Sequence, residues 1–501
     1  MSLTQLSTRA QEGINAPEVN VEVHISNGLP AFTMVGLPEA AVREARDRVR
    51  SAIINSGFEF PARRITVNLA PADLPKEGGR YDLAIALGIL AASSQINAST
   101  LDQFDCYGEL ALSGECRPIA GLLPALISSK QQHKKVIIPH QNEPEASLIE
   151  GLTIFTSQSL AQICASLNGG HPLPQLEALD ARYTPHFECD LDEVYGQYQA
   201  RRALEIAASG AHHMIMMGPP GTGKSMLAQR LNTILPLMSE AEAMSSASIR
   251  SISHKPVNAD NWLQRPFQSP HHTVSGVALV GGGSNPKPGE ISLAHNGVLF
   301  LDELTEFDRK SIEVLREPLE TGKIHISRAA RQAEFPAQFQ LVAAMNPCPR
   351  GCDSIVSCDC SAEQLSRYRN KLSAPLMDRI DIQIELPRLQ SHELLNRKQV
   401  KQEASDVVRT RVTRTRAKQL QRQSCLNSRL TNHQIDHFCQ LDETSEKILM
   451  TAIDKLKLTA RSYHKLLKLA RTIADMADEK NIQKMHLLEA ISYRQQDKRP
   501  L

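Results

Sequence analysis

One segment of the chain has the residue types and the spacing of a phosphate-binding loop. From Gly218 to Ser225 the sequence reads Gly-Pro-Pro-Gly-Thr-Gly-Lys-Ser and fits the pattern G-x-x-x-x-G-K-[ST] at every required position. The glycines let backbone N–H groups turn toward phosphate, the lysine places a cation at the β and γ phosphates, and the serine offers a hydroxyl to Mg²⁺. The pattern therefore predicts ATP and Mg²⁺ as cofactors. The residues expected to hold the nucleotide are Gly218, Pro219, Pro220, Gly221, Thr222, Gly223, Lys224 and Ser225.

Two later apolar runs end in side chains that complete a site for ATP hydrolysis. Asp302 and Glu303 follow one of them directly. Asp302 can join Ser225 in holding Mg²⁺, and Glu303 can orient the attacking water. The other run ends at Asn346, whose amide could polarise this water or sense the γ-phosphate. Because the carboxyl ends of parallel strands meet at one edge of a sheet, we expect these side chains beside the phosphate loop.

Two arginines are further candidates for the catalytic site. Arg379 lies just after the core, where an arginine would supply positive charge to the transition state in a neighbouring subunit, which requires a ring. The alternative is an ordinary ion pair with Asp378 or Asp381. Arg461 lies near the start of a predicted helix and is a candidate for sensing the nucleotide state. For Arg461 the alternative is a solvated helix residue.

Four of the ten cysteines gather in one loop that also contains proline and glycine. Such a loop can bring four thiolates within reach of one tetrahedral ion, which predicts a structural Zn²⁺ site. The spacings differ from the usual C-x-x-C pairs, and free or redox-sensitive thiols are the alternative. The four residues are Cys348, Cys352, Cys358 and Cys360.

Contacts with nucleic acid would have to come from local basic segments. The chain has 56 lysines and arginines against 55 aspartates and glutamates, a formal charge of +1, so no global basic field indicates DNA binding. The segment 322–332 presents Lys323, Arg328 and Arg331 just before the strand that ends at Asn346. We predict that Arg328 and Arg331 contact DNA phosphates, with ion pairs at a subunit interface as the alternative.

Two other segments are weaker candidates for DNA or metal contacts. The glycine-rich insert at about 269–288 has the composition of a mobile loop in a ring's pore. Its pair His271 and His272 is more typical of a structural role than of a metal site. A basic run at 409–422 falls in a probable helix, and such runs are more often solvated faces than DNA-binding surfaces.

The elements that must position these residues form an α/β fold. The apolar run His213–Met217 indicates a buried strand entering the phosphate loop, and Ser225–Leu235 indicates the helix leaving it. Later strands at Val298–Leu301 and Phe339–Ala344 describe a parallel-sheet nucleotide-binding domain. After about residue 390 the pattern is almost wholly helical, with helices expected at Thr444–Lys457, Thr459–Met476 and Lys484–Gln495.

The length of 501 residues is enough for about three domains that each bury a core. In the first, residues 19–25 alternate with period two and 32–35 follow the Asn27-Gly28 turn, which predicts a strand hairpin. An amphipathic helix is expected at 39–54 and an apolar one at 82–92. The predicted boundaries are 1–168 for this domain, 169–190 for a linker, 191–390 for the ATPase core and 391–501 for the helical domain.

With these residues identified, the chain resembles the ComM/YifB family of magnesium-chelatase-like AAA+ ATPases over almost its full length. The resemblance implies a Lon-protease-like α+β N-terminal domain, a P-loop core of the helix-2-insert class and a C-terminal helical lid. It also implies Asn346 as sensor 1 and Arg461 as sensor 2. The stretches that carry it are 61–78, 218–225, 269–273, 288–303 and 372–382.

For the ComM branch of this family, the resemblance implies a homo-hexameric DNA helicase. Such an enzyme would act on single-stranded and branched DNA and drive branch migration of recombination intermediates in natural transformation. The alternative is a chelatase- or chaperone-type motor with the same ATPase site, which remodels a protein partner. DNA-dependent ATPase activity would separate the two.

The N-terminal domain is expected to be non-proteolytic. In active Lon-type sites a serine follows the Pro-Lys-acid-Gly turn, whereas here Arg80 stands at that position after Pro75-Lys-Glu-Gly-Gly. Without this nucleophile a serine–lysine dyad cannot assemble there. We therefore expect a binding or assembly domain, in which Lys76 and Arg80 could contact DNA or be solvated loop charges.

Neither a signal peptide nor a membrane span is expected. The first ten residues lack the apolar centre of a signal peptide, and the longest apolar segment, around Leu83–Ala92, is too short to cross a bilayer. These features predict a cytoplasmic protein without a membrane partner.

Overall fold

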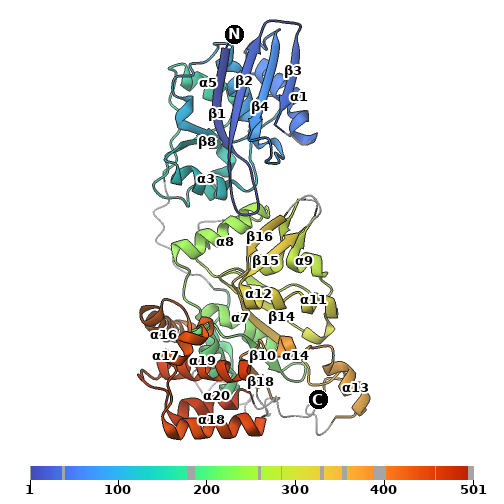
Figure 1. Cartoon of the computed structure of the whole chain (residues 1–501), viewed down its shortest axis with the longest axis vertical. Coiled ribbons are helices and arrows are strands. Elements are labelled where there is room, and N and C mark those ends of the chain that lie inside the picture. The colour runs from blue at the N-terminus through green and yellow to red at the C-terminus, as the bar shows by residue number, and fades with distance from the viewer. Residues whose placement is uncertain are drawn as a thin grey trace. The chain divides into compact units, whose positions relative to one another are not determined.

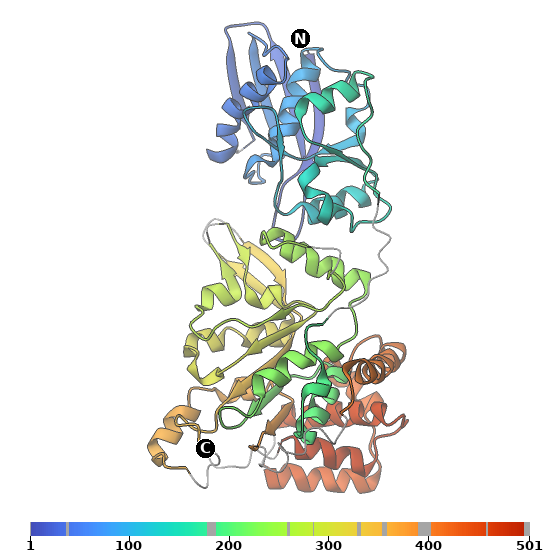
Figure 2. The ribbon, with the colours of Figure 1, turned by 180° about the vertical axis from the view of Figure 1, so that it is seen from behind.

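The computed structural model describes residues 2–36, 40–177, 187–257, 261–283, 285–327, 332–352, 358–388, 402–456 and 459–494. The chain divides into two compact units (Figures 1 and 2). The first comprises 1–184 together with 247–262, and the second comprises 185–246 together with 263–501. None of the helices in the described part of the chain is long and apolar enough to cross a membrane.

The first unit contains a seven-stranded mixed sheet in the order β3-β4-β2-β1-β5-β8-β9. In β2 every second side chain is fully buried, because helices cover one face of the sheet. Figure 1 faces the sheet, and Figure 2 shows the helices of the other face. The strands are β1 Ser2–Arg9, β2 Glu18–Ser26, β3 Ala31–Val35, β4 Arg64–Ala70, β5 Phe104–Cys106, β8 Lys135–Pro139 and β9 Ile154–Ser157.

The apolar helix α2 forms the centre of this unit. All of its residues are buried, and it packs against β1, β2 and α1. A side chain in place of Gly88 would put its Cβ 2.6 Å from Val23 Cγ2, so the close approach of α2 to the sheet depends on glycine. The main helices are α1 Ala40–Asn55, α2 Asp82–Ala92, α3 Leu122–Gln131, α4 Glu143–Ala146 and α5 Leu160–Leu167.

The predicted hairpin between β2 and β3 is wrong. β4 lies between the two strands, pairing antiparallel with β2 and parallel with β3. The chain passes from β3 to β4 through α1. Val49 and Ile53 of this helix are fully buried in the core. This β-α-β connection buries an amphipathic helix face that a two-stranded hairpin would leave uncovered.

The second unit contains a five-stranded parallel sheet in the order β11-β14-β17-β10-β18. Its inner strands are continuous apolar runs, as expected when both faces of a parallel sheet are covered. The predicted α/β fold class is therefore confirmed. The elements are α6 Tyr198–Gly210, β10 Met214–Met217, α7 Lys224–Ile234, β11 Phe267–Gln268, β14 Val298–Leu301, β17 Gln340–Met345 and β18 Ile382–Glu385.

Several short elements interrupt this sheet. The glycine-rich insert forms a short helix and a two-residue strand pair, and β15 and β16 form an antiparallel hairpin before β17. These elements are α8 Glu240–Ile252, α9 Gly276–Val280, β12 Gly281–Gly282, β13 Lys287–Pro288, α10 Glu290–Leu293, α11 Arg309–Glu313, α12 Arg316–Thr321, β15 Lys323–Ser327, β16 Gln332–Pro336, α13 Ala362–Arg369 and α14 Ala374–Met377.

The last part of the second unit is helical, as predicted. The helix α19 packs against α6, α16, α17 and α20, and its buried face shares one apolar core with the parallel sheet. In Figure 1 these helices form the orange-to-red group. They are α16 Ser405–Gln423, α17 Asn432–Phe438, α18 Glu443–Leu456, α19 Ala460–Met476 and α20 Lys484–Ser492.

Candidate active site

The phosphate loop connects β10 to α7 in a conformation that requires glycine. Gly221 and Gly223 have φ angles of 80° and 86°, in the left-handed region that side chains disfavour. A Cβ on Gly218 would lie 2.6 Å from the carbonyl oxygen of Leu386, which follows β18. The loop is thus a strand–turn–helix connection whose helix N-terminus can receive phosphate.

Lys224 is almost buried at the start of α7. Its Nζ donates hydrogen bonds to the carbonyl oxygens of Gly218 at 2.7 Å and Pro219 at 2.9 Å, and to Asn346 Oδ1 at 3.1 Å. Burial lowers the pKa of this amine, while the nearby carboxylates of Asp302 and Glu303 oppose the shift. The lysine and the predicted sensor amide are therefore in direct contact.

The ends of the central strands bring the predicted Mg²⁺ ligands together. Met217 pairs with Met345, and Leu301 pairs with Ala343, so β10, β14 and β17 end at the same edge of the sheet. Ser225 Oγ donates a hydrogen bond to Asp302 Oδ2 there. A hydroxyl and a carboxylate are hard oxygen ligands that suit Mg²⁺.

Glu303 faces a histidine of the glycine-rich insert. Its backbone adopts a φ of 50°, and its N–H donates to Asp302 Oδ1 at 2.9 Å. His272 Nδ1 lies 3.3 Å from Glu303 Oε2, and the ring of His271 stacks near that of His272 at 4.1 Å between centroids. The sequence favoured a structural role for this pair over a metal site, within a candidate pore insert. No local pattern links His272 to a carboxylate so far along the chain, so the contact was not predicted.

The backbone of Asn346 also accepts a hydrogen bond. The Tyr368 hydroxyl donates to the Asn346 carbonyl oxygen at 3.3 Å and accepts from Thr305 Oγ1 at 2.7 Å. Tyr368 comes from α13 and Thr305 from the turn after β14. The amide at the end of β17 is thus tied to the segment that follows Asp302 and Glu303.

Arg379 lies at the other edge of the sheet. Ile382 pairs with Met214 and Glu385 pairs with Met217, so β18 begins where β10 begins, and the phosphate loop follows the opposite end. Arg379 precedes β18 and is 9% exposed. Four-residue strands span about 13 Å, which separates Arg379 from the phosphate loop of its own chain.

Arg379 and Arg461 meet at one carboxylate that the sequence analysis did not identify. Glu320 in α12 accepts hydrogen bonds from both guanidinium groups, one at each oxygen. The hydrogen bond from Arg379 is the largest of the contacts that lower the pKa of Glu320. Arg379 thus pairs with Glu320, while Asp381 accepts a hydrogen bond from Lys465 Nζ at 2.6 Å.

The four cysteines of the loop lie together. Their Sγ atoms are all within 4.8 Å of one another, and the group can hold a metal ion. Burial opposes ionisation of Cys348, but hydrogen bonds from Cys352, Cys358 and the Arg350 backbone lower its pKa to about 7. The thiolate is the form of cysteine that binds metals.

The segment that carries the candidate DNA contacts forms the antiparallel hairpin of β15 and β16. Arg328 and Arg331 lie outside the described residues. Lys323 on β15 is half-exposed, and its Nζ lies 2.7 Å from Glu334 Oε1 on β16. His325 Nδ1 lies 3.4 Å from the other oxygen of Glu334, so this carboxylate offsets part of the hairpin's positive charge.

The expectation for Lys76 and Arg80 is wrong, because both side chains are buried. Lys76 Nζ donates to the carbonyl oxygens of Gly36 and Pro71. Arg80 Nη2 donates to the Ala120 carbonyl oxygen at 2.6 Å. These cations satisfy backbone carbonyls inside the first unit, and are neither DNA contacts nor solvated loop charges.

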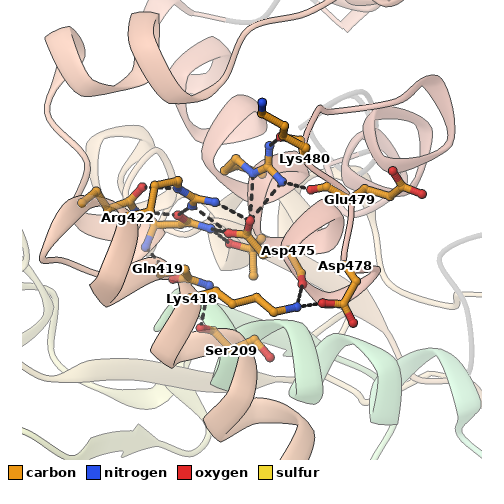
Figure 3. A network of polar contacts seen from close by, with 12 residues as sticks. Ser209, Lys418, Gln419, Arg422, Asp475, Asp478, Glu479 and Lys480 are labelled. Atoms are coloured by element: carbon orange, nitrogen blue, oxygen red, sulfur yellow. Dashed lines mark hydrogen bonds and ion pairs between the residues drawn. The ribbon is translucent and has the colours of Figure 1, made fainter.

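The basic run of α16 serves helix packing. Figure 3 shows Arg422 directed at Asp475 of α19, with Lys418 reaching Asp478 and the Asp475 carbonyl oxygen. Arg416 is buried and donates to the Ala208 carbonyl oxygen. The solvated face is present in part, since Arg411 and Arg414 are exposed, but even these two arginines form ion pairs within the chain. The remaining pairs are Arg409 with the Thr233 carbonyl, Arg411 with Glu205 and Glu403, and Arg414 with Asp478.

Models of the magnesium chelatase subunit ChlI match most of the chain. The model described as "Magnesium chelatase, subunit ChlI" matches residues 190–394. "Subunit ChlI of Mg-chelatase" matches 21–142, and "Magnesium chelatase, subunit ChlI C-terminal" matches 402–494. Along the chain, the match at 21–142 lies in the first unit, the match at 190–394 contains the parallel sheet, and the match at 402–494 contains the C-terminal helices.

Some relatives match the chain from end to end, and another matches one part of it. Competence protein ComM of Haemophilus influenzae is 49% identical over 498 residues, which cover 99% of this chain and 98% of ComM. YifB of Escherichia coli is 49% identical with the same coverage. Lon protease 2 of Bacillus subtilis is 25% identical over 179 residues, covering 31% of this chain and 32% of that protein.

Proposed function

We propose that this chain, which belongs to the ComM/YifB family of magnesium-chelatase-like AAA+ ATPases, is a hexameric DNA motor that drives branch migration. The family supports ATP hydrolysis with Mg²⁺. The convergence of Lys224, Ser225 and Asp302 at one sheet edge is the observation that carries this part of the proposal. The competence protein that matches the whole chain supports action on DNA during natural transformation.

The residues of the site have complementary roles in this proposal. Lys224 binds the β and γ phosphates, while Ser225 and Asp302 hold Mg²⁺, which would neutralise charge on the transferred phosphate. Glu303 orients the attacking water, and Asn346 senses the γ-phosphate through its position beside Lys224.

The position of Arg379 supports a ring. This arginine lies at the sheet edge opposite its own phosphate loop, so in the proposed ring it would act on the triphosphate of a neighbouring subunit. An arginine supplied in trans stabilises the transition state and makes hydrolysis depend on assembly. We propose that the N-terminal domain is a non-proteolytic binding or assembly module of this ring.

We further propose that the cysteine cluster binds structural Zn²⁺. Four thiolates within 4.8 Å of one another form a ligand set that suits a tetrahedral ion. Metal analysis of the purified chain should find one zinc per subunit, and Cys358→Ser/Cys360→Ser should lose it. A parent chain without stoichiometric zinc would leave the thiols free or redox-sensitive.

A protein-remodelling motor is the alternative, since the matching models are named for a magnesium chelatase subunit. The two functions share the ATPase site and differ in the substrate that is moved, which is DNA in one and a protein in the other. Single-stranded and branched DNA would stimulate the ATPase of a DNA motor. The ATPase rate of a protein-remodelling motor would not change with either DNA.

The deciding experiment is ATP-driven processing of labelled four-way and three-strand DNA junctions. The parent chain is compared with Glu303→Gln, which retains the shape of the side chain and loses the water-orienting carboxylate. We expect the parent to resolve the junctions and the variant to leave them intact. Intact junctions with an active, assembled parent ATPase would support the remodelling motor instead.

A further inference from the structure

One carboxylate of the second unit binds both Arg379, which is proposed to act on a neighbouring subunit's triphosphate, and Arg461, the candidate for sensing the nucleotide state. Glu320 lies near the end of α12, and its two oxygens accept hydrogen bonds from Arg379 and Arg461 separately. Arg379 comes from the turn between α14 and β18, and Arg461 comes from the first turn of α19. Three segments that are distant in sequence therefore meet at one side chain.

Arg379 has a second contact of its own, and the helix that carries Arg461 is held by a separate ion pair. Arg379 Nη1 donates to the Pro375 carbonyl oxygen at 2.6 Å, and its Nε is buried without a partner among the described residues. The helix that carries Arg461 is fixed to the strand after Arg379, because Lys465 Nζ lies 2.6 Å from Asp381 Oδ1. The helical domain and the β18 strand are thus joined on both sides of Glu320.

The charge of this group favours an anion. Two guanidinium groups share one carboxylate, which leaves a net positive charge. Arg379 is 10% exposed, whereas Glu320 is 51% and Arg461 is 43% exposed, so the group opens to solvent. A carboxylate between two arginines also offsets their mutual repulsion, which would otherwise drive them apart.

We propose that Glu320 is a positioning residue that holds Arg379 and Arg461 as one cationic pair, which the triphosphate of a neighbouring subunit engages as a unit. The inference rests on the proposed ATP hydrolysis in a ring. Because α19 carries one arginine and the turn before β18 carries the other, engagement of the pair couples the helical domain to the sheet. Glu320 accepts from one nitrogen of each guanidinium, so other N–H groups of the pair remain to donate to a triphosphate while the carboxylate holds the two arginines in place.

Glu320→Gln tests this role, since it keeps the shape of the side chain and removes the charge that balances two cations. Without DNA, we expect the kcat of ATP hydrolysis to fall about tenfold with little change in KM, as for misplaced transition-state groups. Glu320→Asp, which cannot span both arginines, should behave in the same way. Glu317→Gln, on the exposed side of the same helix, is the matched control and should match the parent.

A double-mutant cycle separates positioning from mere folding. In the parent, Arg379→Ala and Arg461→Ala should lose activity non-additively, because the arginines act as a unit. In the Glu320→Gln background, each arginine substitution should cost less. The inference would be overturned if the fold loss of the double arginine variant equalled the product of the two single losses. A Glu320→Gln variant with the parent's kcat would overturn it as well.

Assembly supplies a readout that does not need hydrolysis. The oligomer mass is titrated with a non-hydrolysable ATP analogue, and Glu320→Gln should need about tenfold more analogue for half-assembly. An unchanged midpoint would count against the inference. A parent that assembles but never hydrolyses ATP would overturn the proposed hydrolysis while this titration still tests Glu320.

Discussion

At the residue scale, Lys224 is the link between phosphate binding and the sensor amide. Its ammonium group has three protons and three oxygen acceptors, the carbonyls of Gly218 and Pro219 and the amide of Asn346. A triphosphate in the loop would compete with these oxygens for the protons. We expect nucleotide binding to loosen the Lys224–Asn346 contact. The change would then be transmitted to β17, which Asn346 directly follows.

The contact between His272 and Glu303 leads to a prediction at the same scale. His272→Ala should raise the basal ATPase rate, because the carboxylate is freed from its partner to orient water. An exposed pair is worth about 0.2–1 kcal/mol, which corresponds to a rate increase of up to about fivefold. Steady-state hydrolysis without DNA measures the effect.

The neighbouring substitution His271→Ala is the matched control, since its ring bonds to Thr273 rather than to Glu303. It should leave the basal rate near that of the parent. A fall in rate for His272→Ala as large as that for Glu303→Gln would show that the histidine assists hydrolysis instead of restraining it.

At the element scale, the attachment of α16 to α19 depends on one buried carboxylate. Asp475 is 3% exposed and accepts hydrogen bonds from Arg422, Arg471 and Asn427 (Figure 3). Arg471 is itself 3% exposed. Charge balance inside this network therefore comes from Asp475.

Asp475→Asn should destabilise the helical domain, because it leaves two arginines without their carboxylate. Loss of one partner from a buried ion pair costs about 3 kcal/mol. The urea midpoint of the helical transition measures it. Asp478→Asn is the control, since the half-exposed Asp478 should contribute less than about 1 kcal/mol. Equal losses in the two variants would contradict the prediction.

The buried His295 and the half-buried His213 make the second unit sensitive to acid. His213 Nδ1 accepts from the Leu341 N–H, and His295 Nδ1 accepts from the Gln338 N–H, each at 3.0 Å. Burial lowers the pKa of each imidazole from 6.5 to about 4. Both are therefore neutral in the folded chain at a pH where the unfolded chain binds protons.

The unfolded state binds more protons between pH 4 and 6.5, so stability is present above about pH 6.5 and is lost as the pH falls toward 4. Each histidine contributes up to roughly 3 kcal/mol to this loss. His295→Gln should make the urea midpoint less dependent on pH, whereas the exposed His433→Gln should retain the parent's dependence. Identical pH profiles for His295→Gln and the parent would refute the assignment.

At the scale of the whole molecule, the proposed ring makes each active site a shared one. The phosphate loop and Arg379 lie at opposite edges of the same sheet, and a heterologous contact repeated around a ring would bring one subunit's arginine to the next subunit's loop. ATP hydrolysis would then depend on assembly.

Mixing inactive subunits tests this arrangement. Arg379→Ala and Glu303→Gln should each be nearly inactive alone. An equal mixture should regain about a quarter of the parent's activity, since random assembly in a closed ring pairs an intact site with an intact arginine at that frequency. Exchange of labelled subunits is the control. Verified exchange without recovered activity would place Arg379 outside the neighbouring site.

Local patterns were sufficient for the phosphate loop and for most elements of its sheet. The glycines of the loop, the apolar runs and the carboxylates that follow them act within a few residues of one another, so their geometry is predictable from spacing. The helices α2 and α19 match their predicted ranges for the same reason. The hairpin between β2 and β3 failed because a local turn signal could not reveal that β4 inserts between the strands.

The sequence by itself determined the α/β class, the phosphate loop, the two carboxylates after β14 and the closeness of the four cysteines in the chain. Only the tertiary structure decided the partners of the isolated charges. It placed Glu320 between two arginines that lie 59 and 141 positions away, His272 against Glu303, and Lys76 and Arg80 in the interior. Such contacts leave no periodic trace in the sequence, because they depend on where separate elements pack and on which carbonyls or carboxylates remain to be satisfied there.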